Sequence, residues 1–431
     1  MLVEFTVGNY RSFRDRNTLS MVAAHITAEN KSVDENNVIP LEDDLALLKS
    51  AAIYGANASG KSNLVSALFF AWQLVLQSSK ETQAGEPIAV EPFALGTGDT
   101  AKPAFFEFVF LAEGTKYRYG FEATRNEVVS EWLSRIPRVK SIPLFERTRQ
   151  DIQVSDKHFA EGLELRAKTR NNALFLSVAA QFNGPIASKV LGWFRNCNVI
   201  SGLEDIGHMV FTAECVEDPK RHELIVDLVR SLDLNIRDLS VQKADLTKEA
   251  LPKDMPDEIK AVFLHPSFKS APRIRTLHHK YDDRGRPTGD VTFDLDNEES
   301  EGTKKLVALA GPIVDTLTRG KILIVDEFDA RMHPIIAREI VGLFNSSETN
   351  PHGAQLVFTT QDTNLLDRRV FRRDQIWFTE KDRCEATHLH SLVEYKVRND
   401  ASFETNYIAG RYGAVPFVGR FGFETDGEDA Q

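Results

Sequence analysis

The sequence predicts an α/β protein with a mixed sheet. Three observations support this fold class. Helical and strand patterns alternate from residue 303 to residue 359, which is typical of parallel βα units. A glycine-rich turn at 55–62 stands between a short apolar run and an amphipathic segment. Two runs of alternating apolar residues flank Glu113-Gly114, which indicates a β-hairpin and hence an antiparallel region.

Composition and charge exclude several classes of protein. The chain has 431 residues, of which 42% are hydrophobic and 27% charged, so it suits about three globular folding units rather than a disordered or fibrous chain. A net charge of −11 argues against a surface that binds nucleic acid throughout. We expect no membrane span, no signal peptide and, with three cysteines, no disulfide framework. These features predict a soluble cytoplasmic protein without membrane contact.

The first half of the chain predicts a strand, a helix and an antiparallel sheet. Alternation over 2–7 indicates a strand that ends at Gly8-Asn9, and the polar stretch 27–44 is expected to be a loop. Residues 51–54 form a short buried strand, and apolar spacing of four predicts a helix over 61–77. Turn residues over 81–103 indicate a connection, after which an antiparallel sheet is expected over 103–155.

The second half is expected to begin with helices and to end with alternating elements. Residues 173–230 have a mainly helical pattern, and 235–290 combine strands at 236–241 and 274–278 with a proline- and lysine-rich stretch, 251–272. A helix over 303–318, a strand over 322–325, a helix over 334–345 and a strand over 355–359 follow. No heptad run persists between Ser62 and Ser300, so no long coiled coil is expected. The acidic end, 424–431, is expected to be disordered.

The strongest motif is Gly55-Ala-Asn-Ala-Ser-Gly-Lys-Ser62, which matches G-x4-G-K-[ST]. Glycines let backbone N–H groups turn toward phosphates, Lys61 can reach the β and γ oxygens, and the Ser62 hydroxyl can hold Mg²⁺. The helix that begins at Lys61 adds its positive dipole end. A turn that only caps a helix is the alternative, but the preceding strand favours phosphate binding.

Two carboxylates follow the apolar run 322–325. The run predicts a central strand, and Asp326 and Glu327 come at its carboxyl end, where ligands bind in open α/β sheets. Asp326 would bind Mg²⁺, and Glu327 would polarise the attacking water as a general base. Two solvated acids that end a strand are the alternative, which the phosphate loop makes less attractive.

Residues 299–303 (Glu-Ser-Glu-Gly-Thr) predict the start of a helix. Ser300 or Thr303 would cap it, and Gly302 would leave the backbone N–H groups open. Such a helix start can bind a second phosphate surface, and its place about 25 residues before the carboxylates favours that role over an ordinary cap.

With the order in which its motifs occur along the chain, the sequence resembles the RecF/SMC/OLD branch of ABC-type ATPases. Within that branch it is most similar to the short abortive-infection ATPases (AbiL/RloA-like) that occur beside phage-defence effectors. The resemblance covers almost the full length and is weakest over about 205–270. The stretches that carry it are Asn9–Phe13, Gly55–Ser62, Leu174–Ser177 through Phe182, Ser300–Thr303, Val325–Asp329, Phe358–Asp362, Asp374–Trp377 and Tyr407–Pro416.

The resemblance implies an ABC-type P-loop ATPase head with a mixed sheet, an antiparallel β lobe, a helical insertion and no long coiled coil. The ATPase core would be discontinuous, over 1–80 and 290–400. The β lobe would span 81–172, the mainly helical lobe 173–289 and the C-terminal tail 401–431.

The resemblance also implies a head-to-tail dimer, or a higher oligomer, that holds ATP and Mg²⁺ between protomers. The signature of one protomer would face the phosphate loop of the other, Asp329 would belong to the D-loop, Arg11 would contact the nucleotide and Gln181 would be a further Mg²⁺ or water ligand. The nucleotide-binding residues would be Gly55, Ala56, Asn57, Ala58, Ser59, Gly60, Lys61, Ser62, Asn63 and Arg11; the signature would be Ser300, Glu301, Gly302 and Thr303; and the metal ligands would be Ser62, Asp326 and Gln181.

One residue departs from the family pattern. Relatives place a switch histidine after the last core strand, whereas Gln361 follows Thr359-Thr360 here. Glutamine can donate a hydrogen bond toward a γ-phosphate but cannot become cationic. With Glu327, Lys61 and Gln361 as the catalytic residues, we therefore expect slow hydrolysis, or tight ATP binding with turnover as a timer. His333 is a poor substitute because Pro334 follows it at a helix start.

The function that the resemblance implies is an ATPase switch in abortive infection that senses a phage product and controls a separately encoded effector such as a nuclease. No Asp-x-Asp pair follows Gln361, so no nuclease of the Toprim kind is expected in this chain. A RecF-like DNA-repair ATPase that clamps DNA is the main alternative, and a small-molecule kinase is a third. Contact with DNA is open, and its candidate cations are Arg135, Arg138, Lys140, Arg368, Arg369, Arg372 and Arg373. The sequence has no HExxH or Cys-x2-Cys pattern of a zinc site. Cys384, His388 and His390 could converge, but His388-Leu389-His390 is expected to form one face of a strand.

Overall fold

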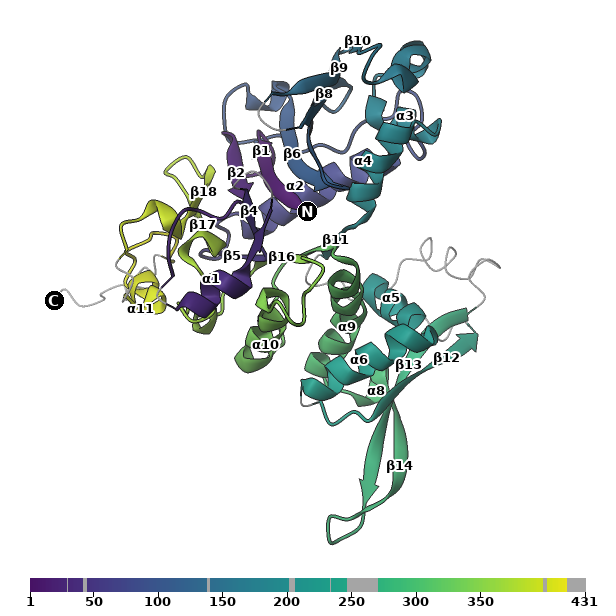
Figure 1. Ribbon diagram of the computed structural model, residues 1–431, viewed down its shortest axis with the longest axis vertical. Helices are drawn as coiled ribbons and strands as arrows, with labels where there is room; N and C mark the ends of the chain where they lie inside the picture. The colour runs from purple at the N-terminus through teal and green to yellow at the C-terminus, as the bar shows by residue number, and fades with distance from the viewer. Residues whose placement is uncertain are drawn as a thin grey trace, which may run out of the picture.

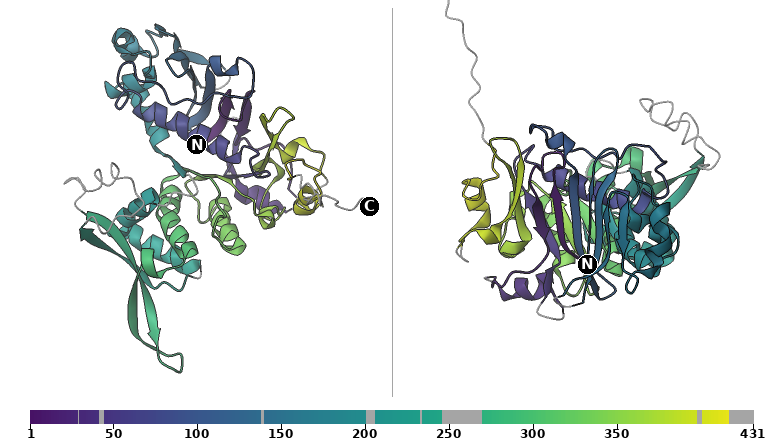
Figure 2. Two further views of the ribbon diagram at one scale, coloured as in Figure 1. Left: turned by 180° about the vertical axis from the view of Figure 1, so that it is seen from behind. Right: turned by 90° about the horizontal axis from the view of Figure 1, so that it is seen from above.

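The computed structural model describes residues 1–28, 30–41, 45–137, 140–200, 206–232, 234–245, 270–397 and 401–416. Arg138, most of 251–272 and the acidic end at 424–431 lie outside these ranges. The chain forms two large sheets with helices around them, and a smaller sheet ends in a hairpin that projects from the body (Figures 1 and 2).

A six-stranded sheet lies at the centre and carries the predicted motifs at the ends of its strands. Its order is β11-β15-β16-β5-β17-β18; the first five strands are parallel, and β18 is antiparallel to β17. These strands are β11 (Cys197–Ile200), β15 (Ile322–Val325), β16 (Gln355–Thr359), β5 (Ser50–Tyr54), β17 (Ile376–Lys381) and β18 (Thr387–Ser391). The parallel βα arrangement confirms the predicted α/β fold class.

Helices cover both faces of this sheet because alternate residues of each strand point to opposite sides. Ala51 and Ile53 of β5 join one core with α2, whereas Ala52 and Tyr54 join a second core with the other helices. The helices around the sheet are α2 (Lys61–Gln77), α5 (Ile206–Glu217), α6 (Pro219–Ser231), α9 (Glu301–Arg319) and α10 (Pro334–Asn345). The predicted helices 61–77 and 334–345 therefore have the expected bounds.

A seven-stranded antiparallel sheet packs on the other side of α2. Phe106 and Phe108 belong to one strand of this sheet and are buried on the face that meets the helices. Phe106 contacts Phe70 of α2, and Phe108 contacts Phe194 of α4 (Pro185–Arg195). The sheet combines two strands from residues 2–20 with five strands from residues 104–154. The division of the chain into domains stays a prediction. Its order is β10-β9-β8-β7-β6-β1-β2, with β10 (Asp151–Val154), β9 (Ile142–Thr148), β8 (Val128–Ile136), β7 (Thr115–Ala123), β6 (Ala104–Ala112), β1 (Leu2–Gly8) and β2 (Asn17–Ser20), and α3 (Phe175–Gln181) and α4 (Pro185–Arg195) lie beside it.

A three-stranded sheet adjoins α5, α6 and α9. Its strands are β12 (Asp238–Asp245), β13 (Ser270–Tyr281) and β14 (Pro287–Asp294), and α8 (Leu295–Glu298) connects it to α9. Figure 1 shows the β13–β14 hairpin extending away from the helices. β13 extends beyond the predicted strand 274–278, and its residues 279–281 pair with exposed residues of β14 that lack a regular apolar alternation.

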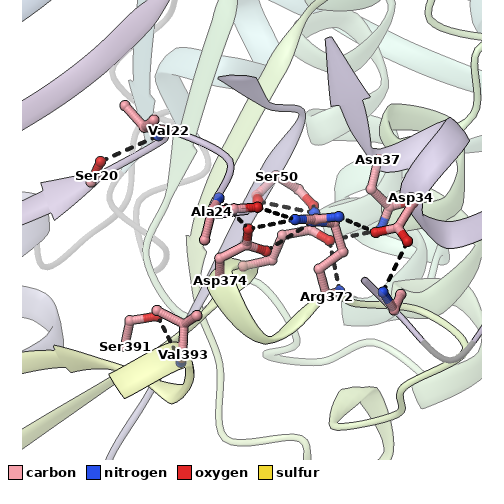
Figure 3. A network of polar contacts seen from close by, with 12 residues as sticks. Ser20, Val22, Ala24, Asp34, Asn37, Ser50, Arg372, Asp374, Ser391 and Val393 are labelled. Atoms are coloured by element: carbon pink, nitrogen blue, oxygen red, sulfur yellow. Dashed lines mark hydrogen bonds and ion pairs between the residues drawn. The ribbon is translucent and has the colours of Figure 1, made fainter. Parts of the chain in front are cut away.

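The prediction of a loop over 27–44 is wrong in part. It contains α1 (Lys31–Asn37) and β3 (Val38–Pro40), which pairs with β4 (Ala46–Leu48). Buried polar groups hold this segment on the core: the Arg372 guanidinium donates to Asp34, to Asp374 and to the Ala24 carbonyl (Figure 3). Partners more than 300 positions away in the chain stabilise this helix, so the local sequence gives little sign of it.

The first part of the expected C-terminal tail packs into the core. α11 (Phe403–Ile408) places Tyr407 between Tyr54 and Phe378, with ring centroids 5.9 and 5.4 Å away. Short 3-10 helices complete the described structure: η1 (Asp99–Ala101), η2 (Ala160–Lys168), η5 (Thr363–Leu365), η6 (Arg373–Gln375) and η7 (Leu392–Glu394). None of the helices in the described ranges combines the length and the apolar character needed to cross a membrane.

Candidate nucleotide-binding site

The loop at 55–60 connects the carboxyl end of β5 to the start of α2. Gly60 has φ +111°, and a Cβ there would lie 2.3 Å from the Thr387 Oγ1. A Cβ on Gly55 would lie 2.4 Å from the Ser59 Oγ. Both glycines are therefore needed for the close approach of the backbone, as expected of a phosphate-binding loop.

Hydroxyl groups from distant strands hold this loop. The Ser59 and Thr379 hydroxyls are 2.7 Å apart, and the Thr387 hydroxyl donates to the Ser59 carbonyl at 2.9 Å. The Ser12 Oγ lies 2.8 Å from the Thr387 Oγ1 and accepts from the Asn63 side chain at 2.7 Å. Sequence reasoning missed these three supporting residues; Ser12 alone carried a signal, because it belongs to the Asn9–Phe13 motif.

Lys61 is buried under the loop, and its charge lies near three carboxylates. Its ammonium donates to the Gly55 and Ala56 carbonyls at 2.7 and 3.1 Å. Burial lowers the pKa of Lys61, whereas the negative charges of Asp326, Glu327 and Asp329 act in the opposite direction. The structure thus brings the two strongest motifs of the sequence into electrostatic contact, although they are more than 260 residues apart.

A buried threonine organises the carboxylates. The Thr359 hydroxyl donates to the Asp326 Oδ1 at 2.5 Å and accepts from the Glu327 N–H at 2.7 Å. Glu327 itself has φ +47°, an uncommon conformation for a residue with a side chain. Thr359 ends β16, the strand between β15 and β5, so one hydroxyl sets the geometry of both acids beside the phosphate loop.

The oxygen groups at this edge of the sheet suit Mg²⁺. The Ser62 side chain is exposed at the start of α2, and Asp326 is partly exposed with one oxygen engaged by Thr359. Mg²⁺ takes few protein ligands and completes its shell with phosphate oxygens and water. Ser62 and Asp326 would therefore act together with a bound nucleotide.

The predicted signature forms the start of α9. Ser300 is the N-cap, and its Oγ accepts from the Thr303 N–H at 3.1 Å. The Glu301 carboxylate accepts from Lys304 at 2.8 Å and from Arg331 at 3.0 Å. Arg331 follows the predicted D-loop, and a Cβ on Gly302 would lie 2.9 Å from its carbonyl oxygen. The signature therefore contacts the chain just beyond the D-loop of its own protomer.

Gln361 and Arg11 lie at the margin of the site. Gln361 is exposed after β16, and its N–H donates to the Asp329 carboxylate at 3.4 Å. Arg11 donates to both oxygens of Glu91 at 3.1 and 3.0 Å, although its neighbour Ser12 contacts α2 through Asn63. The structure thus brings Gln361 to the carboxylates and directs the Arg11 guanidinium to Glu91.

A protein-family model matches most of this chain. The family model "AAA domain, putative AbiEii toxin, Type IV TA system" matches residues 50–367 of the 431. The chain belongs to this family. The matched range covers the predicted phosphate loop, signature and carboxylates of this AAA-domain protein, and the family supports an ATPase. The narrower resemblance to AbiL/RloA-like proteins stays a prediction.

Three solved structures illustrate the wider similarity of this AAA-domain protein. It is similar to the SMC head domain from Thermotoga maritima, with 13% identity, TM-score 0.41, and 90% of this chain and 98% of that chain covered. An SmcHead bound to the C-winged helix domain of ScpA has 13% identity, TM-score 0.44 and coverage of 90% and 97%. An Smc head domain with an extended coiled coil, bound to the C-terminal domain of ScpA and derived from Pyrococcus furiosus, has 12% identity, TM-score 0.40 and coverage of 95% and 98%. A comparison with curated proteins gives no match.

Gln181 lies away from the site. The residues after α2 contact the region around α3: the Ser79 N–H donates to the Ser177 Oγ at 3.3 Å, and the Leu174 N–H donates to the Ser78 Oγ at 3.1 Å. The phosphate loop is at the opposite end of α2, about 25 Å away for a helix of this length. The structure therefore does not bring the exposed Gln181 to the proposed Mg²⁺ ligands, because a 17-residue helix separates them.

Three of the candidate cations for nucleic acid make contacts within the chain. Arg372 is 4% exposed and belongs to the buried network of Figure 3. Arg369 pairs with Asp367 at 2.7 Å, and Arg373 donates to the Val397 carbonyl at 2.9 Å. The dense run of arginines in the sequence therefore serves structural contacts in part, which sequence spacing could not distinguish from a binding surface.

Proposed function

We propose that this AAA-domain protein is an ATPase switch that binds ATP and Mg²⁺ and converts ATP and water to ADP and phosphate. The observation that carries the proposal is the juxtaposition of Lys61 with Asp326, Glu327 and Asp329 at the carboxyl edge of parallel strands. Lys61 would bind the β and γ phosphates, Ser62 and Asp326 would hold Mg²⁺, and Glu327 would orient and deprotonate the attacking water. Gln361 would donate a neutral hydrogen bond toward the γ-phosphate.

The active form in this proposal is a head-to-tail dimer or a higher oligomer. The start of α9 is exposed at Ser300 and Glu301, so its free N–H groups can face the triphosphate of another copy. The Glu301–Arg331 contact joins the signature to the residues after the D-loop. One surface would therefore present both elements to the second protomer, and ATP would act as the bridge between copies.

The biological role in this proposal is control of a separately encoded effector, such as a nuclease, in abortive infection. The family description, which names a Type IV toxin–antitoxin system, supports a defence setting. ATP binding would stabilise the dimer, a phage product would trigger the change, and hydrolysis would reset it as a shift in populations. A nuclease gene beside this gene would support the role, whereas neighbouring replication genes would favour DNA repair.

The test combines two variants and one measurement of assembly. Lys61→Ala should weaken ATP binding at least about 100-fold because the phosphates lose their buried cation, as measured by equilibrium binding. Lys80→Ala, at an exposed lysine after the same helix, is the matched control. Glu327→Gln should retain binding, reduce turnover about 100-fold or more and accumulate ATP-bound dimers in light scattering.

Failure of this test has two distinct forms. Turnover at the wild-type rate in Glu327→Gln would remove Glu327 as the base. Monomers at saturating ATP would refute the dimeric switch. Salt-sensitive stimulation of turnover by duplex DNA would instead support the RecF-like alternative.

A further inference from the structure

A short rigid connection joins the β13–β14 hairpin to the signature. β14 ends at Asp294, whose carboxylate caps α8 by accepting from the Asp296 and Asn297 N–H groups, each at 3.1 Å. α8 ends at Glu298, and only Glu299 and Ser300 precede α9. Both of these residues are extended, with ψ of 158° and 154°. Few residues therefore lie between the base of the hairpin and the signature that could adjust to a displacement of that base.

Glu299 closes this connection back onto β13. Its Oε1 accepts from the Thr276 Oγ1 at 2.5 Å and lies 2.8 Å from the His278 Nε2. The side chains of Glu299 and His278 are 12% and 16% exposed, and Thr276 is fully buried. The ring of Phe293 on β14 packs against His278 with centroids 5.0 Å apart. The residue before the signature cap is thus anchored inside the base of the hairpin.

The outer part of the hairpin lies in solvent. From residue 283 to residue 290 every residue is exposed, and Tyr281 is 59% exposed. Figures 1 and 2 show this part projecting from the body. A two-stranded ribbon gains little stability without further packing. The base, rather than the tip, is where the hairpin contacts the nucleotide machinery.

We propose that Glu299 is a positioning residue that couples the β13–β14 hairpin to the signature. The inference rests on the proposed head-to-tail ATP dimer and names the contact that regulates its closure. With Glu299 held by Thr276 and His278, the residue before the Ser300 cap has a fixed position at the start of α9. Without these contacts, the start of α9 keeps only local restraints among the contacts described above: the Ser300 cap and the exposed pairs of Glu301 with Lys304 and Arg331. Exposed pairs are weak restraints.

The test measures ATP-driven self-association of the full chain in a Glu327→Gln background, together with ATP binding to the monomer at low protein concentration. Glu299→Ala should weaken association about tenfold or more, because it removes the contacts to both Thr276 and His278 and a hydrogen bond to a charged group contributes about 1.5–3 kcal/mol. ATP binding to the monomer should not change, because the phosphate loop belongs to another segment. Asp296→Ala, at an exposed carboxylate in α8, is the matched control and should leave both quantities unchanged.

Substitutions of Thr276 separate positioning from a general loss of structure. Thr276→Val should reproduce a large part of the association defect, although Glu299 keeps its contact to His278. Thr276→Ser should keep association near the wild-type level because it keeps the hydroxyl, and Thr276→Val with Glu299→Ala should be no worse than Glu299→Ala alone. Melting temperatures identify variants that fail to fold, in which case the Thr276→Val and Thr276→Ser pair decides. Wild-type-like association of Glu299→Ala, or additive effects of the two substitutions, would overturn the inference. Absence of ATP-driven association in the Glu327→Gln parent would instead overturn the proposed dimer.

Discussion

At the scale of single residues, Thr359 shows how one hydroxyl can organise the edge of a sheet that carries two proposed catalytic acids. It is fully buried, donates to Asp326 and accepts from the Glu327 N–H. A short hydrogen bond to a carboxylate orients the group and is stronger than one between neutral partners. The two acids of the carboxylate motif therefore depend on a residue of the adjacent strand that no local pattern marks as functional.

Thr359→Val keeps the volume of the side chain and removes both hydrogen bonds. We expect kcat for ATP to fall about 10- to 100-fold, because a hydrogen bond to a charged group contributes about 1.5–3 kcal/mol. Steady-state turnover over a Mg²⁺ titration should also show a higher metal requirement. Thr360→Val changes an equally buried neighbour whose hydroxyl accepts only from the Asp362 N–H. Equal effects of the two substitutions would contradict the role assigned to Thr359.

At the scale of elements, α3 is held on the antiparallel sheet by a buried carboxylate. Glu131 of β8 accepts from the Phe175 and Leu176 N–H groups at 2.7 and 2.9 Å and lies 3.5 Å from the Arg147 guanidinium. Burial raises the pKa of Glu131, whereas Arg147 and the two N–H groups act against that rise. The helix start thus obtains its cap from another element rather than from its own sequence.

Glu131→Ala should lower the free energy of unfolding by about 3–5 kcal/mol, because Arg147 and the two N–H groups would remain buried without their partner. Denaturation by urea, followed by circular dichroism, measures this change. Glu122→Ala removes a partly exposed carboxylate on the adjacent β7, paired with Arg16, and should cost about 1 kcal/mol or less. A small effect of Glu131→Ala would show that the Arg147 contacts to backbone carbonyls suffice.

At the scale of the whole molecule, the two ends of the sequence meet at the nucleotide site. Ser12 from the first loop contacts Asn63 at the start of α2, while Tyr407 from α11 packs against Tyr54, the residue before Gly55. Glu404 of the same helix accepts from Thr363, just beyond Gln361. Residues 402–416 therefore support both sides of the predicted phosphate site.

Tyr407→Ala should destabilise the fold by about 3–5 kcal/mol, since it empties a packed aromatic position and removes a hydroxyl that donates to the Ala414 carbonyl. ATP affinity should fall as well, because Tyr54 loses the contact that fixes the strand end before the loop. Ile408→Ala, at a neighbour that is 63% exposed, should change neither quantity. Calorimetry with and without ATP tests both expectations, and equal melting temperatures for the two variants would contradict them.

The sequence predicted elements well where one pattern covers a whole element. The helix at 61–77 and the strands at 322–325 and 355–359 match because apolar periodicity and turn residues agree there. The pattern failed for α1 and for β11 (Cys197–Ile200), since both are short and gain their stability from distant partners. Gln181 was assigned to the site by resemblance, and the length of α2 separates it from the phosphate loop.

What the sequence by itself determined is the local chemistry: a glycine-rich loop with a lysine, a strand with two acids after it and a capped helix start. Each of these follows from neighbouring residues, because backbone conformation and periodicity are local properties. Only the tertiary structure decided which groups meet. Thr359, Thr379, Thr387 and Glu299 gain their roles from strand order and burial, and such contacts depend on chain segments that no local pattern relates to one another.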